Sequence, residues 1–495
     1  GFIDVHVHLD PILRLSNSES HVRQGVTTSL GGPDGTSPWP FGEFLDTLSQ
    51  VGVGMNVAYL VGHNTVRRNV MGLENRAPSE EELNEMKRQI GAGMDEGAYG
   101  ISTGLKYLPG SFSEVEEVIA LSKKASEKEL NEMERQISVG MDEGAYGIST
   151  GLKYLPGSFS EVEEVVELSK RASEKGGVYT SHLRDEGLGI IESVNEAIKI
   201  SKEADIPVVL THHKVIGKPM WGKSAQTLSL VDSARTVGLK ISLDQYPYDA
   251  SYTGISVLIP SWARAGGQKA FVKRTEDVYL RDSIKKGIVF NILNDRGGND
   301  LDRVQFAKVS WNNSLEGKTL KYWAKTLGLA PSVENGAELV IKAQLNGGAS
   351  AIFHAMDEKD VENIMKHPLT MIASDGRLVS PGEGHPHPRW YGTFPRVLGH
   401  FVRDKKTLSL EEAIYKMSLL PAQTIGIKKR GLIKRGMFAD ITIFDKNTII
   451  DRATFEDPHQ YSEGIYYVLV NGRIAIDAGK FQNIKAGKVL RKNSD

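Results

Sequence analysis

Short apolar runs rich in Val, Ile and Thr alternate along this chain with longer amphipathic stretches. This alternation is typical of repeated β-α units with a buried parallel sheet. One segment of the chain occurs twice in nearly identical form. When its two copies are counted as one, there are eight apolar runs, the number of strands that closes a (β/α)8 TIM-like barrel. The expected strands are residues 2–8, 26–32, 55–63, 99–103 or 146–150, 176–183, 207–213, 239–248 and 369–376.

The spacing of these runs predicts an α/β protein with three parts. The barrel is expected over residues 1–425. The stretch between the seventh and eighth strands is too long for a connecting loop, so we expect an inserted lid over about residues 255–350. After about residue 425 the pattern changes to alternating strands with turn residues, which predicts a small β-sandwich-type domain over 426–495.

A tandem repeat interrupts the barrel region. Residues 82–128 recur almost unchanged as residues 129–175. A solenoid would show many diverged copies, whereas two nearly identical copies indicate a recent duplication. Either copy fits the flanking sequence, so the pattern leaves open which copy supplies the fourth strand.

The composition excludes several classes of site and partner. The chain contains no Cys, which removes disulfides, thiolate nucleophiles and Cys-ligated zinc. With 60 basic and 62 acidic residues the net charge is −2, which offers no electrostatic basis for binding nucleic acid. The apolar runs are too short to span a bilayer. We therefore expect a cytoplasmic protein with no nucleic-acid or membrane partner, of unknown oligomeric state.

Histidines stand at the ends of three expected strands. His6 and His8 are two residues apart on the first strand, so their side chains point to the same side. The fifth strand ends with His182, and the sixth ends with His212 and His213. Strand ends of a barrel meet at one face, so these imidazoles predict a metal site, with Zn²⁺ favoured over other divalent ions.

The eighth strand ends in the motif Ser374-Asp375-Gly376. A carboxylate beside a metal site can take a proton from water and later deliver it to a leaving amine, which favours hydrolysis as the chemistry. A turn-forming or helix-capping Asp is the structural alternative.

Many collinear motifs carry a resemblance to a known family. GFIDVHVHLD resembles the first strand of the metal-dependent amidohydrolase superfamily. Further motifs, spread almost from end to end, resemble the N-acyl-D-amino-acid deacylases, or D-aminoacylases: VRQGVTT, STGLKYLPG, YTSHLRDEG, THHK, WGKSAQ, DQYPYDAS, ASDG, HPHPRWYGTFPRVLGHFVR, LPAQTIGI, ADITIFD and DRATFEDPHQYSEGI.

The resemblance implies zinc-dependent hydrolysis of N-acyl-D-amino acids to a carboxylate and a free D-amino acid, with one or two metal ions per chain. It also implies roles for particular residues. His6 and His8 would hold one metal position, His182 and His212 the other, and Asp375 would be a ligand and the general base and acid. Arg389 and Lys214 would bind the substrate carboxylate, a task that suits a guanidinium fork. Tyr246 would bind substrate and polarise the scissile carbonyl.

The sequence departs from the family pattern in three places. Asp34 stands where the family carries a metal-ligating Cys. Lys153, or Lys106 in the first copy, ends the fourth strand, and a carboxylated Lys153 bridging two metals would replace the missing thiolate. The strands that precede the first barrel strand in the superfamily, and pair with the C-terminal domain, are missing here.

Other functions remain open at this point. A cyclic amidase of hydantoinase or dihydroorotase type, or a dipeptidase, would use the same metal chemistry. Arg389 and Lys214 favour an acyclic substrate with a free carboxylate, because a neutral ring would leave both cations unpaired. A non-catalytic barrel scaffold is the alternative from a different class.

Overall fold

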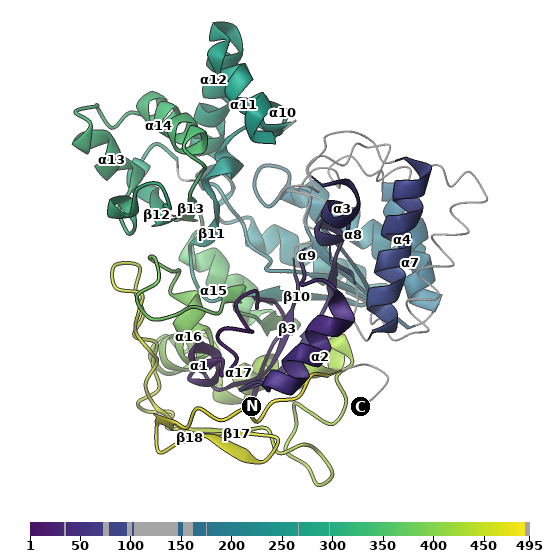
Figure 1. Ribbon diagram of the computed structural model, residues 1–495. Coiled ribbons are helices and arrows are strands. Elements are labelled where there is room, and N and C mark those ends of the chain that lie inside the picture. Colours follow the sequence, from purple (N-terminus) through teal and green to yellow (C-terminus); the bar gives the residue numbers. More distant parts are fainter. Residues whose placement is uncertain are drawn as a thin grey trace.

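The computed structural model describes residues 1–33, 36–72, 79–96, 101–102, 147–151, 162–174, 176–265, 267–296 and 298–490. Figure 1 shows three regions: parallel strands with their surrounding helices, an insertion that extends away from them, and a small sheet near the C-terminal end. Three sequence-predicted site residues, Asp34, Lys106 and Lys153, lie outside the described residues.

Parallel strands form the centre of the molecule. One sheet has the order β1-β3-β4, a second has the order β14-β10-β9-β8-β7-β6-β5, and β2 pairs with β15. All of these pairings are parallel. The strands are β1 (Phe2–Asp4), β2 (Val7–His8), β3 (Val26–Gly31), β4 (Asn56–Tyr59), β5 (Val61–Gly62), β6 (Ile101–Ser102), β7 (Gly147–Gly151), β8 (Val178–His182), β9 (Val208–Leu210), β10 (Ile241–Gln245), β14 (Thr370–Ile372) and β15 (Gly376–Arg377).

The central strands are buried because helices cover them. Every residue of β1, β4, β9 and β14 is buried, as expected for parallel strands without a solvent-facing side. Around the sheet, α7 packs on α8, α8 on α9, and α9 on α15. The helices of this region are α1 (Glu19–Val22), α2 (Phe41–Val51), α3 (His63–Met71), α4 (Glu80–Asp95), α7 (Val162–Glu174), α8 (Ile190–Ala204), α9 (Ser224–Thr236), α15 (Glu358–Lys366), α16 (Arg389–Arg396), the π-helix η7 (Val397–Asp404), α17 (Leu410–Met417) and α18 (Leu419–Ile425).

Both copies of the repeat contribute a strand to the same sheet. β6 comes from the first copy and β7 from the second, and they pair in parallel with Ile101 opposite Ile148. These two residues occupy equivalent positions in the two copies. Counting the repeat once was therefore wrong for this sheet, because both copies keep an apolar strand that can pair with its neighbours.

The segment between β10 and β14 forms a separate unit, in the region where an inserted lid was expected. Its antiparallel sheet has the order β11-β13-β12 and carries its own apolar core, which includes Ile284, Ile288 and Ile292. In Figure 1 its helices extend away from the parallel strands. Its elements are β11 (Ser251–Gly254), α10 (Ser261–Arg264), α11 (Gly267–Glu276), α12 (Val278–Asn294), β12 (Val304–Lys308), α13 (Leu320–Thr326), α14 (Val333–Leu345) and β13 (Ser350–Phe353).

A four-stranded antiparallel sheet lies near the C-terminal end of the chain. Its order is β16 (Ile441–Phe444), β17 (Ile465–Val470), β18 (Arg473–Asp477) and β19 (Lys480–Phe481). A second sheet facing it is not found among residues 426–490, so the sandwich remains a prediction. The residues that follow return to the centre, where Val489 bridges Val57 of β4.

None of the helices in the described ranges combines the length and apolar character needed to cross a membrane.

Candidate metal centre

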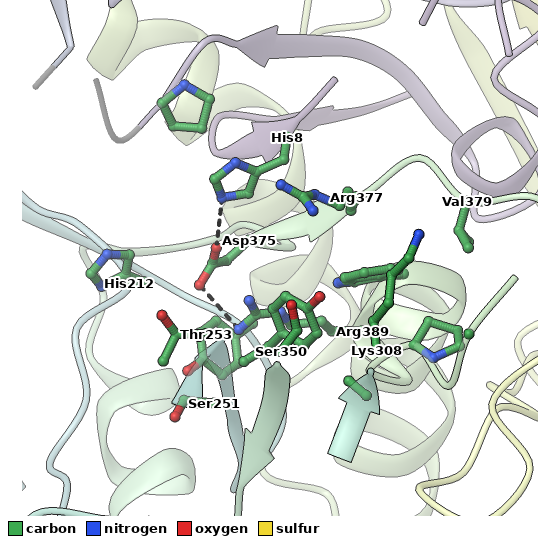
Figure 2. Close-up of a pocket in the computed structure, with 18 of the residues that line it drawn as sticks. His8, His212, Ser251, Thr253, Lys308, Ser350, Asp375, Arg377, Val379 and Arg389 are labelled. Carbon is green, nitrogen blue, oxygen red and sulfur yellow. Dashed lines mark ion pairs between the residues drawn. The ribbon is translucent and has the colours of Figure 1, made fainter. Parts of the chain in front are cut away.

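The carboxyl ends of the parallel strands bring the predicted residues to one cavity of about 460 Å³. His8, His212, Asp375 and Arg389 lie around it in Figure 2. His6 follows β1, and its ring stands 5.2 Å from that of His212, measured between centroids. The predicted residues that line the cavity are His8, His182, His212, Lys214, Tyr246, Asp375 and Arg389.

The first group of possible metal ligands contains His6, His8 and Asp375. One ligand atom from each lies within 4.8 Å of the other two. The Oδ1 of Asp375 is 3.5 Å from the Nε2 of His6 and 3.7 Å from the Nε2 of His8. Two imidazoles and a carboxylate form a donor set that suits Zn²⁺.

The second group contains His182, Glu186 and His212, and all three are buried. The rings of His182 and His212 lie 4.3 Å apart between centroids and are nearly perpendicular. Glu186 was not predicted from the sequence. It stands in the loop after β8, four residues beyond His182, and only that spacing within the motif YTSHLRDEG could have indicated it.

Backbone geometry at two of these residues is unusual. Asp375 has φ 46° and His212 has φ 37°, in the left-handed region that side chains rarely adopt. The Oδ1 of Asp244 accepts the backbone N–H of His212 at 2.7 Å, and the Oγ of Ser374 accepts that of Gly376 at 2.9 Å. These hydrogen bonds stabilise the backbone on either side of the two strained residues. Strained backbone of this kind occurs preferentially at functional sites.

Arg389 and Asp375 form a buried ion pair. The Nη1 of Arg389 lies 3.0 Å from the Oδ2 of Asp375, and the guanidinium also stacks 4.5 Å above the centre of the Tyr246 ring. Burial alone would raise the pKa of Asp375, but Arg389, a hydrogen bond from His8 and the neighbouring His6 together hold it well below its usual value. The carboxylate is therefore ionised at neutral pH.

Lys214 lies beside the cavity, yet its ammonium is engaged by protein groups. It donates a hydrogen bond to Glu186 and another, of 2.8 Å, to the carbonyl oxygen of His212. Burial lowers the pKa of Lys214, against the opposing effect of Glu186. A direct role in binding substrate carboxylate remains a prediction for this residue.

Tyr246 follows β10 and lines the cavity beside Arg389. Its hydroxyl is buried and has no hydrogen-bond partner among the residues that the structure describes. Burial raises the pKa of Tyr246, so the hydroxyl keeps its proton and can donate a hydrogen bond.

Arg296 is a second cavity residue that the sequence did not single out. It belongs to the insertion, is 2% exposed, and its Nη1 donates to the Oγ of Ser251 at 3.1 Å. Since it lies in a segment without a recognisable motif, no local pattern could have indicated its position.

Comparison with known proteins supports the amidohydrolase resemblance. Residues 310–476 match a model of the amidohydrolase family. The D-aminoacylase of Alcaligenes xylosoxydans xylosoxydans is 32% identical over 100% of this chain and 87% of the relative. The N-acyl-D-glutamate deacylase of the same organism is 34% identical over 100% of this chain and 86% of the relative.

A solved structure extends the similarity to the fold. It is that of N-acyl-D-glutamate deacylase from Bordetella bronchiseptica, in complex with zinc and a phosphonate inhibitor that mimics the tetrahedral intermediate of its reaction. This chain matches it with a TM-score of 0.71 and 29% identity, over 99% of this chain and 88% of that one. The resemblance seen in the motifs is confirmed, and the chain belongs to the D-aminoacylase family of amidohydrolases.

Proposed function

We propose that this protein is a metal-dependent deacylase of N-acyl-D-amino acids. One observation carries the proposal: two imidazole–carboxylate groups and a buried guanidinium meet at a single cavity. The relatives with the same family assignment are a D-aminoacylase and deacylases of N-acyl-D-glutamate and N-acyl-D-aspartate.

The donor groups fit one or two Zn²⁺ ions. His6, His8 and Asp375 would hold one position, and His182 and His212 the other. Other divalent metals would suit the same donors. When bound, a divalent cation supplies Lewis acidity at the acyl carbonyl and lowers the pKa of water.

The protein's own residues account for binding and proton transfer. Arg389 would bind the substrate carboxylate, Tyr246 would donate a hydrogen bond to the carbonyl oxygen, and Asp375 would take a proton from water and pass it to the amine. The low pKa of Asp375 supplies the ionised carboxylate that the first proton transfer needs.

A bridging ligand and the closure of the barrel belong to the same proposal. A carboxylated Lys153 is proposed to link the two positions, with Lys106 and Asp34 as the alternatives. We further propose that the parallel strands close into one barrel, supported by the pairing of β2 with β15 between the first and last strands.

The cations at the cavity favour an acidic side chain on the substrate. Arg296, Lys214 and Arg389 all line it. An N-acyl-D-glutamate or N-acyl-D-aspartate brings a second carboxylate, which the guanidinium of Arg296 at the cavity would bind. Guanidinium and carboxylate pair well through parallel hydrogen bonds.

A substrate panel tests the function. The zinc-loaded protein is incubated with N-acetyl-D-glutamate, N-acetyl-D-aspartate, N-acetyl-D-leucine, their L-enantiomers, hydantoin and simple dipeptides, and release of free amine is measured. We expect release from the D-compounds, fastest for the acidic ones. Ring opening of hydantoin without deacylation would replace this function with a cyclic amidase. A chain that binds less than about one metal ion and releases no amine would be a scaffold.

A further inference from the structure

His387 is a fully buried histidine that stands two residues before the start of α16. Its ring is surrounded by the rings of Phe455, Tyr248 and Tyr246, whose centroids lie 5.1, 5.4 and 6.4 Å from its own. The planes of Phe455 and Tyr248 are nearly perpendicular to the imidazole. A buried ring packed in this way cannot turn without displacing its neighbours, so the imidazole has a fixed orientation.

Each nitrogen of the His387 ring makes one hydrogen bond to the backbone. The Nδ1 accepts the N–H of Arg389 at 3.0 Å, and the Nε2 donates to the carbonyl oxygen of Ala250 at 2.9 Å. Because a backbone N–H only donates and a carbonyl oxygen only accepts, the ring is neutral and carries its proton on Nε2. Burial, together with the charge of Arg389, holds the pKa of His387 well below its usual value, which agrees with a neutral ring.

The two hydrogen bonds lead to two buried arginines of the cavity. Arg389 lines the cavity and is the first residue of α16. Ala250 directly precedes Ser251, the first residue of β11, whose Oγ accepts a hydrogen bond from the Nη1 of Arg296 at 3.1 Å. The ring of His387 therefore connects the backbone that carries Arg389 to the strand end that holds Arg296.

This connection joins the parallel-strand region to the insertion. The helix α16 packs against β15 of the parallel region, whereas β11 begins the insertion and Arg296 follows its helix α12. Since the insertion has an apolar core of its own, contacts between the two units determine how far apart the two guanidinium groups stand. A substrate with two carboxylates needs two cations at a matching distance, and a displacement of about 1 Å can cost much of that match.

We propose that His387 is a positioning residue that sets the distance between the guanidinium groups of Arg389 and Arg296, and with it the preference for an acidic side chain on the substrate. The inference rests on the proposed function, because it assigns the two arginines to the two carboxylates of the substrate. His387 would act through its two hydrogen bonds, without touching the substrate.

Two variants separate the two hydrogen bonds of His387. In His387→Asn the side-chain oxygen can still accept the N–H of Arg389, but the shorter amide no longer reaches the carbonyl oxygen of Ala250. In His387→Gln the amide nitrogen can take the place of Nε2 and donate to Ala250, while the N–H of Arg389 loses its acceptor. The first variant thus releases the start of β11, and the second releases the start of α16.

His354→Asn is the matched control. The ring of His354 packs on the same Phe455 ring, with 4.6 Å between centroids, but its Nε2 faces the side chain of Gln305. Neither His354 nor His387 is among the described residues that line the cavity. We therefore expect the control to keep the kinetic constants of the wild type.

Steady-state kinetics of the zinc-loaded proteins with N-acetyl-D-glutamate and N-acetyl-D-leucine test the inference. We expect His387→Asn to raise KM for N-acetyl-D-glutamate by about 10-fold and to leave its kcat, and both constants for N-acetyl-D-leucine, close to those of the wild type. We expect His387→Gln to raise KM for both substrates by about 10-fold, because both carry the carboxylate that Arg389 would bind.

The outcomes distinguish this inference from the proposed function. Wild-type constants in His387→Asn, an equal loss for both substrates, or a loss in kcat alone would overturn the inference and leave the deacylase function standing. A wild type that cleaves N-acetyl-D-leucine as well as N-acetyl-D-glutamate would do the same. If His387→Asn does not fold, His387→Gln decides, and an unchanged KM for both substrates would overturn the inference. A wild type that releases no amine from either substrate would overturn both.

Discussion

Arg389 places its Nη1 3.0 Å from the Oδ2 of Asp375, so a buried cation neutralises the carboxylate on the side opposite His6 and His8. The ion pair explains how an acidic group remains charged in a cavity of low exposure. It also orients the other oxygen, Oδ1, toward the two imidazoles.

Replacing Asp375 by Asn removes the proposed proton acceptor. We expect turnover of N-acetyl-D-glutamate to fall by about 10²- to 10⁴-fold, the usual range for a general base. Steady-state kinetics with saturating Zn²⁺ would measure the loss. Asp10→Asn is the control, because Asp10 lines the same cavity but pairs with Arg377 at 3.3 Å, and it should keep most of the activity. Turnover of Asp375→Asn close to the wild-type value would assign the base to another residue.

Replacing Arg296 by Met should alter substrate preference. We expect kcat/KM for N-acetyl-D-glutamate to fall by about 10- to 100-fold, in line with the loss of a charged hydrogen bond. N-acetyl-D-leucine, assayed with the same variant, serves as the internal control and should change little. Equal losses for both substrates would show that Arg296 supports the structure of the cavity and does not select the side chain.

The stability of the insertion should depend on the apolar core that it forms by itself. Ile288 is fully buried in α12, so Ile288→Ala should destabilise the protein by about 2 to 5 kcal/mol through lost burial and a new cavity. Phe290→Ala on the same helix is the control, because Phe290 is 55% exposed and should have little effect. Urea unfolding compares the two variants, and equal midpoints would contradict a packed core at Ile288.

Lys416 should make stability dependent on pH in the alkaline range. Burial lowers the pKa of Lys416 from 10.5 to about 8, against the opposing charge of Glu412. Between pH 8 and 10.5 the unfolded chain therefore holds the proton more firmly than the folded protein, so this residue makes the free energy of unfolding rise with pH. Below pH 8 the cost of burying the ammonium is fully present.

Lys416→Met removes this titration. Relative to the variant, the wild type should gain stability as the pH rises through this window, which urea unfolding at several pH values would measure. Both proteins share all other titrating groups, so their difference isolates Lys416. If the difference in free energy of unfolding between the two proteins stayed constant from pH 7 to 10, the folded state would not disfavour the charged form of Lys416.

Much of the central region was predictable because buried strands appear in the sequence as continuous apolar runs. The apolar runs of β1, β4, β9 and β14 indicated buried parallel strands, and the structure contains them. The histidines were predictable for a related reason, since residues that follow parallel strands meet at one face. His6, His8, His182 and His212 do come together, while their binding of metal stays a prediction.

Other parts of the site depend on tertiary structure and leave no local pattern. Arg296 reaches the cavity from the insertion, and Glu186 reaches His212 because the loop after β8 folds against the segment after β9. The family resemblance implied that Lys214 binds substrate, but no motif indicated that Glu186 would accept a hydrogen bond from its ammonium. The proposed roles of Lys153, Lys106 and Asp34 fall outside the described residues.

The pairing of β6 with β7 indicates how the fold could accommodate the loss or gain of one copy of the repeat. In a parallel sheet a further strand keeps the direction of both neighbours, so an added copy does not reverse the chain that follows it. Excision of residues 82–128 would leave β7 to occupy the place beside β5, with β8 and every later strand in their present order. We therefore expect a chain without residues 82–128 to keep the pairing order of the later strands and, with it, the residues from His182 to Asp375.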